Sequence, residues 1–148
     1  MSSSRERAGD GDGGRHEIVD HTSEVTFRLE APGFPSLLQQ ATRAFGELVP
    51  DRIRRDPSEE WRDLSVYGTD PVASLVAWLN EMVYECEVNQ WLAEEVEVAG
   101  ESDDGTLHVR ARGRHLSEPF VLVKAATLHG AVVRESEKGL WAEVTLDV

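Results

Sequence analysis

The stretch DPVASLVAWLNEMVYEC, residues 70–86, decides the fold class that this chain is expected to adopt. Asp70 can cap free backbone amides, and Pro71 at the first helical position sacrifices no hydrogen bond, so a helix should begin there. The apolar residues that follow recur at intervals of three and four, and they are Val72, Leu75, Val76, Leu79, Met82, Val83 and Cys86. One continuous apolar stripe predicts an amphipathic helix that packs against a second layer.

Patterns upstream of this helix predict two strands and another helix. Apolar and polar residues alternate over residues 24–30, as they do in a strand with one buried face. A second helix is expected to start at Ser36 and to stop before Pro50. Residues 51–60 are charged and contain a proline, so they should form a surface loop before a short strand from Trp61 to Tyr67.

From residue 94 onward, the pattern is that of strands separated by turn signals. The apolar positions of these strands are Val96 and Val98; Leu107, Val109 and Ala111; Val121, Val123 and Ala125; Ala131 and Val133; and Leu140, Ala142, Val144, Leu146 and Val148. The order of elements predicts an α+β fold in which two helices pack on a mixed, largely antiparallel sheet.

The chain has the size and apolar content of one domain, with 148 residues of which 40% are hydrophobic. Residues 1–15 are rich in Ser, Gly, Arg and Asp, so we expect a disordered N-terminal arm followed by a folded domain over residues 16–148. Acidic and basic residues balance in the arm, which leaves the whole formal charge of −13 on residues 16–148. This charge argues against stable direct nucleic-acid binding and favours a cation or a basic protein surface, although it also serves solubility.

The cysteine and hydropathy patterns suggest a cytoplasmic protein. Cys86 is the only cysteine, which excludes an internal disulfide and indicates a reducing compartment. It lies on the apolar stripe, so a buried, inert thiol is expected there. No apolar run is long enough to suggest a membrane segment or a signal peptide.

Carboxylates gather on the non-apolar positions of the first and last predicted strands. Asp20 and Glu24 share one parity of the first strand, and Asp147 lies at the end of the last strand beside the terminal carboxylate of Val148. If these strands are neighbours, the acids would meet, and an oxygen-ligand ion such as Ca²⁺, Mg²⁺ or Mn²⁺ would be the natural occupant. The alternative is a set of solvated charges on the strand faces.

Three other polar residues are candidates for contacts at the same place. Lys124 interrupts an apolar run and must reach water or pair with an acid. His21 lies near a strand start, where a histidine often satisfies a backbone group, and His129 could act in this region only if the fold brings it there.

Two further sequence features bear on function. A basic stretch, comprising His108, Arg110, Arg112, Arg114 and His115, is expected to form a salt-bridged exposed face. The chain has no phosphate-binding glycine loop, CxxC, HExxH or GxSxG motif, so these common routes to catalysis have no support.

Three separated blocks, considered together, resemble the archease family. They are VDHTSEV at residues 19–25, LVAWLNEMVY at residues 75–84, and VKAATLH at residues 123–129 leading to WAEVTLDV at residues 141–148. The resemblance extends over residues 16–148, and the joint occurrence of the blocks is more specific than any one of them.

The resemblance implies an accessory protein and not an enzyme. Archeases assist the GTP- and Mn²⁺-dependent RNA-splicing ligase, promoting guanylylation of its active-site histidine and so its multiple turnover in tRNA splicing and RNA repair. A divalent ion, Ca²⁺ in the first instance, would be held by Asp20, Glu24, Asp147 and Val148. His21, Lys124 and His129 would contact the partner or a phosphate.

One position departs from the family pattern, and two other functional classes stay open. The family motif usually reads DHTAD, whereas Glu24 stands here in place of the second aspartate, and its side chain reaches one methylene further. A metal-dependent phosphoester hydrolase could use the same carboxylates without a partner. An acidic, chaperone-like interaction module would leave them merely solvated.

Overall fold

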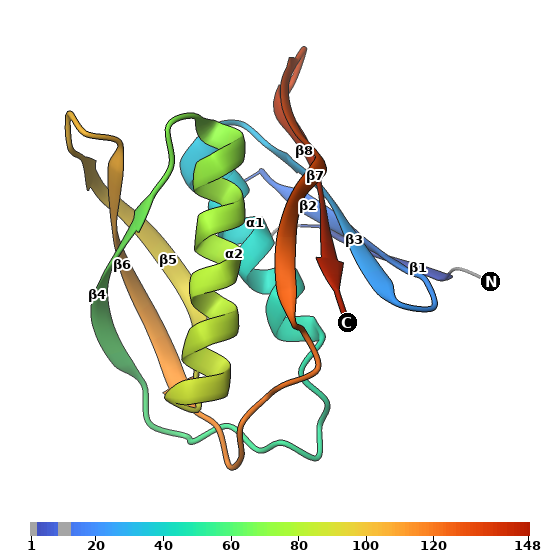
Figure 1. The fold of residues 1–148 in the computed structure, drawn as a ribbon, viewed down its shortest axis with the longest axis vertical. Helices are drawn as coiled ribbons and strands as arrows, with labels where there is room; N and C mark the ends of the chain where they lie inside the picture. Colours follow the sequence, from blue (N-terminus) through green and yellow to red (C-terminus); the bar gives the residue numbers. More distant parts are fainter. Residues whose placement is uncertain (1–2, 9–12) are drawn as a thin grey trace.

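The structure is a computed structural model that describes residues 3–8 and 13–148. Its elements in chain order are β1 (Ser3–Ala8), β2 (Arg15–Asp20), β3 (Glu24–Ala31), α1 (Phe34–Glu47), β4 (Glu60–Tyr67), α2 (Pro71–Val88), β5 (Trp91–Glu101), β6 (Thr106–His115), β7 (Ala125–Ser136) and β8 (Gly139–Asp147) (Figure 1).

The strands form two antiparallel sheets, and both helices pack between them. One sheet has five strands in the order β1-β2-β3-β8-β7, and the other has three in the order β4-β6-β5. Figure 1 shows α2 lying between the three-stranded sheet and strands β7 and β8. The predicted α+β class with two helices is confirmed, although the described strands are all antiparallel and divide into two sheets instead of one.

Helix α2 forms as the sequence predicts. The Asp70 carboxylate accepts a hydrogen bond from the Ala73 amide at 2.8 Å, and Pro71 occupies the first turn. The apolar stripe lies in the core, where Trp78 and Leu79 are fully buried. Among the described residues, no helix is both long and apolar enough to cross a membrane.

Helix α1 begins three residues earlier than the cap at Ser36 predicts. Its N-cap is Gly33, and the Ser36 hydroxyl donates to the Gly33 carbonyl at 3.2 Å. A buried contact joins the two helices, because the indole of Trp78 donates to the Thr42 hydroxyl at 2.9 Å. The pairing fixes the position of α2 relative to α1 inside the core.

Each helix also protects one sheet edge with a side-chain amide. Gln39 of α1 accepts from the Val96 amide of edge strand β5 at 2.7 Å and donates to the Glu94 carbonyl at 3.3 Å. Asn80 of α2 does the same for edge strand β7, accepting from the Ala126 amide at 2.8 Å and donating to the Ala126 carbonyl at 3.1 Å. These bonds satisfy backbone groups that an edge strand would otherwise leave unpaired.

The N-terminal region differs from the expected disordered arm. Residues 3–8 form strand β1, which pairs antiparallel with β2, and Arg15 already belongs to β2. Backbone hydrogen bonding to a neighbouring strand orders a segment that carries little apolar surface of its own. The remaining residues of the predicted arm, 1–2 and 9–12, lie outside the described residues.

The region around Val123 also differs from its prediction. Residues 121–124 lie outside the strands, and a single strand, β7, replaces the two that were predicted over residues 121–133. Phe120 packs edge-to-face on Phe45 with ring centroids 6.0 Å apart, and its amide donates to the Cys86 carbonyl at 3.2 Å. Tertiary packing on the helices therefore outweighs the strand propensity of this apolar run.

We expect the Cys86 thiol to be unreactive in the folded protein. It is fully buried on α2, as the sequence predicts, and burial with the nearby Glu85 carboxylate raises its pKa to about 12. Thiolate is the reactive species, so a disulfide reagent at pH 8 should modify Cys86 only on the timescale of unfolding, and at once in denaturant. Rapid labelling of the native protein would contradict the buried placement.

Candidate functional site

The first and last strands of the predicted domain are neighbours in the five-stranded sheet. Strands β3 and β8 pair antiparallel, and the register places Glu24 directly opposite Asp147. Residues opposite each other in an antiparallel pair project from the same face, with Cβ atoms about 5 Å apart. Both side chains are exposed, so the pairing brings two carboxylates together at one end of the sheet.

Backbone hydrogen bonds draw two more segments to this end of the sheet. The Lys124 amide donates to the Asp147 carbonyl at 2.8 Å, and the Val148 amide donates to the Ser23 carbonyl at 3.1 Å. In Figure 1, the C-terminal end of β8 lies beside the start of β7. We call this end of the sheet the acidic tip and define it by Glu24, Lys124, Asp147 and Val148.

Asp20 does not share the face of Glu24, contrary to the parity argument from the sequence. It ends strand β2, where its backbone lies between Ser3 of β1 and Val25 of β3. Because Val25 is a buried residue that points to the core, the register puts Asp20 on the core side of the sheet end. A turn over residues 21–23 separates β2 from β3 and breaks the alternation assumed from Asp20 to Glu24.

The two histidines occupy different positions relative to the acidic tip. His21 is exposed in the β2–β3 turn, and its backbone amide donates to the Glu24 carbonyl at 2.9 Å. His129 is exposed in the irregular part of β7, and its amide donates to the Thr127 hydroxyl at 3.1 Å. The register therefore takes His129 along β7 away from the pair formed by Glu24 and Asp147, and only His21 adjoins the tip.

The acidic tip does not present a complete metal site by itself. Among residues 3–8 and 13–148, no three His, Cys, Asp or Glu side chains lie close enough together to hold a metal ion. The described residues offer two opposed carboxylates, neither of which has an ion-pair partner within that part of the chain. Like charges opposite each other on a sheet are destabilising, and a cation between them would relieve the repulsion.

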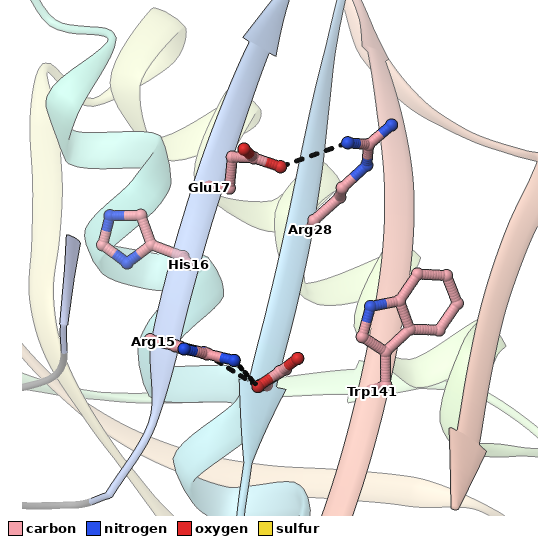
Figure 2. Close-up of a pocket in the computed structure, with 6 residues that line it drawn as sticks. Arg15, His16, Glu17, Arg28 and Trp141 are labelled. Carbon is pink, nitrogen blue, oxygen red and sulfur yellow. Dashed lines mark hydrogen bonds and ion pairs between the residues drawn. The ribbon is translucent and has the colours of Figure 1, made fainter. Parts of the chain in front are cut away.

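A polar depression on the outer face of β2, β3 and β8 is a weaker candidate (Figure 2). Its charged groups already neutralise one another: Arg15 is 2.7 Å from Glu30, and Arg28 is 3.2 Å from Glu17. His16 borders the depression, but its ring bonds to Gln40 and Glu47 of α1 in the interior. Because these charged groups pair with one another, few of them are available to bind a ligand. We therefore interpret the depression as a salt-bridged strand face.

The basic stretch on β6 has the salt-bridged role that its sequence predicts. Arg112 lies 3.4 Å from Glu59, and Arg114 lies 2.7 Å from Glu94 and 2.5 Å from Glu59. Trp61 covers the same face, with the Arg110 guanidinium 4.7 Å from the centre of its ring. These arginines are engaged within the protein, as expected of a salt-bridged exposed face.

Asn80 is a residue of the site region to which sequence reasoning gave no role. Its amide clamps Ala126, next to Ala125, which pairs with Asp147. The sequence marks Asn80 only as a polar residue inside the apolar block LVAWLNEMVY. In the structure the Asn80 side chain is half-buried. Asn80 thus connects the rigid core helix to the strand that borders the acidic tip.

These features define a small acidic α+β protein with opposed carboxylates at the end of one sheet. The model of the Archease protein family matches residues 16–148, and the chain belongs to this family. It is 30% identical over 141 residues to protein archease of Archaeoglobus fulgidus, covering 90% of this chain and 99% of that protein. It is 33% identical over 139 residues to protein archease of Methanopyrus kandleri, covering 89% of this chain and 98% of that protein.

A solved structure supports the fold independently. The crystal structure of an archease described as a possible chaperone, from Thermotoga maritima, matches with a TM-score of 0.63. The match covers 87% of this chain and 94% of that chain at 16% sequence identity, so it is a likeness of fold. The family model and the two relatives confirm the family resemblance drawn from the three sequence blocks.

We expect replacement of Asn80 by Ala to lower the free energy of unfolding by about 1–3 kcal/mol, because the Ala126 amide and carbonyl lose their partners. Urea denaturation followed by circular dichroism measures this loss. Asn80→Asp is the matched variant, since it keeps an acceptor for the Ala126 amide but no donor for the carbonyl, and it should fall between Ala and wild type at neutral pH. Equal stability of all three proteins would contradict the clamp.

Proposed function

We propose that this protein is an accessory protein of the GTP- and Mn²⁺-dependent RNA-splicing ligase, which it activates by promoting guanylylation and multiple turnover. The observation that carries the proposal is the direct pairing of Glu24 with Asp147 on adjacent strands. Membership of the archease family supplies the class of protein. The description of the Thermotoga maritima relative as a possible chaperone agrees with action through a protein partner.

The donor set at the acidic tip suits a hard divalent cation such as Ca²⁺, Mg²⁺ or Mn²⁺. Glu24 and Asp147 would hold the ion, and the backbone of Val148, which follows Asp147, would add an oxygen atom. Mg²⁺ in particular is often bound by one or two carboxylates, with water and substrate phosphates completing its shell. An ion held from one side in this way would stay open to the partner's nucleotide phosphates.

The remaining groups around the tip have supporting roles in this proposal. Lys124 is exposed, and its backbone amide donates to the Asp147 carbonyl. Its ammonium group could therefore contact a phosphate of the partner's nucleotide. His21, next to Glu24, could donate to the partner. Asp20 lies on the other side of the sheet end and would be an outer contributor, while His129 would contact the partner only through the exposed part of β7.

The charge of the whole protein favours the same partner. An enzyme that binds RNA presents basic surfaces, and a protein with a formal charge of −13 is attracted to them. Such attraction raises the association rate and makes it sensitive to salt. When bound, the ion would stabilise negative charge on the nucleotide phosphates during guanylylation, while the chain itself would bind preferentially to the competent form of the ligase.

We expect calorimetry to detect binding of Ca²⁺ or Mn²⁺ that weakens at least about tenfold in Glu24→Gln and in Asp147→Asn. Each change removes one negative charge and keeps the size of the side chain. The exposed Glu101→Gln, on β5, is the matched control and should bind like wild type. Binding that is unaffected by the two tip variants would place the ion elsewhere.

We expect stoichiometric addition of the protein to raise guanylylation and multiple-turnover joining by the cognate ligase. Asp147→Ala should abolish the rise, and Asp20→Ala should reduce it less, because Asp20 lies off the paired carboxylates. The measurements are labelling of the ligase with radioactive GTP and joining of RNA ends with the ligase limiting. No rise with wild type would refute the proposal, and cleavage of phosphate esters without any ligase would point to a hydrolase instead.

A further inference from the structure

The exposed apolar side chains of this protein are concentrated at one end of α2. Among the described residues, the large hydrophobic side chains that are strongly exposed are Trp61, Tyr67, Tyr84, Val88, Val121, Leu122 and Leu128. Trp61 is covered by arginines. Four of the others come from the C-terminal half of α2 and from residues 121–122, which follow Phe120, whose amide donates to the Cys86 carbonyl of that helix.

The large exposed apolar residues of α2 share a single helical face. Tyr84 and Val88 are four residues apart, so they lie in a row along the helix, in line with the half-buried Ala77. Tyr84 is 52% exposed and Val88 57% exposed, although the opposite face of α2 is completely buried. In Figure 1, α2 runs between β4 and β7. We call Tyr84, Val88, Val121 and Leu122 the helix patch.

The charged side chains that α2 itself places beside the helix patch are all acidic, while Lys124 lies two residues after Leu122. Helix α2 has no Lys or Arg over its 18 residues, and Glu81 and Glu87 flank the row. Neither carboxylate has an ion-pair partner within the described part of the chain. Glu81 also lines a shallow groove between α2 and β4, together with Tyr67 and Tyr84, and its partial burial and the nearby Glu85 raise its pKa. A cation brought to this face would therefore be favourable.

The helix patch continues into the acidic tip. Leu122 lies two residues before Lys124, whose amide is bonded to Asp147. A partner that reaches the tip therefore meets the exposed residues 121 and 122 immediately beside it. Apolar side chains gathered at one surface and rimmed by charge are typical of a protein interface.

We propose that the helix patch is the docking surface for the same partner enzyme, through a partner surface with an apolar centre and a rim of Lys and Arg. The inference rests on the proposed function and adds the place at which the partner is held while the tip reaches its active site. Tyr84 and Leu122 would provide the apolar anchors, and Glu81 and Glu87 would pair with the basic rim. A second copy of this chain fits poorly, because its own patch would bring more carboxylates to the same contact.

The test compares binding of the cognate ligase to wild type and to three variants, by biolayer interferometry with the ligase immobilised. Leu122→Asp, Tyr84→Ala and Glu87→Lys should each weaken binding by about tenfold or more, mainly through faster dissociation for the first two. Their controls are Ser136→Asp, at the far end of β7, and Glu101→Lys at the end of β5. Both controls make the same charge change far from the patch and should bind like wild type.

Two further measurements keep the outcomes distinct. Metal binding by calorimetry and the thermal transition by circular dichroism should be unchanged in the variants, which separates a lost docking contact from a damaged tip or fold.

If wild type does not bind the ligase, the proposed function itself fails. If wild type binds and activates but the patch variants bind equally well, only the docking surface is refuted. Wild-type self-association in sedimentation, relieved by Leu122→Asp, would assign the patch to a second copy and overturn the inference.

Discussion

The pairing of β3 with β8 is the constraint on which the rest of this structure depends. Val25, Phe27 and Leu29 of β3 are buried with Val144 and Leu146 of β8, and these apolar side chains fix the register of the two strands. A shift of the register by one residue would turn the buried apolar side chains of one strand toward solvent. The core would lose these contacts, so the shifted register is strongly disfavoured. The opposed carboxylates of Glu24 and Asp147 are thus imposed by the core, in spite of their mutual repulsion.

The helices stabilise this arrangement at the edges of the sheets as well as in the core. An edge strand exposes backbone donors and acceptors that invite pairing with another chain. Here Gln39 and Asn80, one from each helix, bond the edge strands β5 and β7 with side-chain amides. The clamp on Ala126 has an additional effect, because β7 borders the acidic tip. The position of the tip is therefore coupled to α2, and through the bond between Trp78 and Thr42 to α1.

Sequence reasoning succeeded where one local signal dominated and failed where tertiary pairing decided the outcome. The Asp70 cap and the apolar stripe specified α2, and alternation specified the faces of β3 and β8, whereas the meeting of Glu24 with Asp147 depended on a strand pairing that only the structure shows. The place of Asp20 was missed, because a hairpin turn between β2 and β3 resets the parity. Strand β1 was missed because its sequence, SSRERA, carries almost no apolar signal, and its pairing with β2 is visible only in the structure. The role of Asn80 depends on a contact between residues 46 positions apart, which no local pattern reveals.

The protein departs from the rules of a stable soluble domain at two neighbouring places. At the acidic tip, like charges face each other across a strand pair, and at the helix patch, apolar side chains stay in water beside unpaired carboxylates. Violations of this kind are expected at functional sites, where the missing stabilisation comes from a ligand or a partner. A cation would relieve the first and a basic, apolar protein surface the second. Because residues 121–124 join the two places, one partner could satisfy both at once.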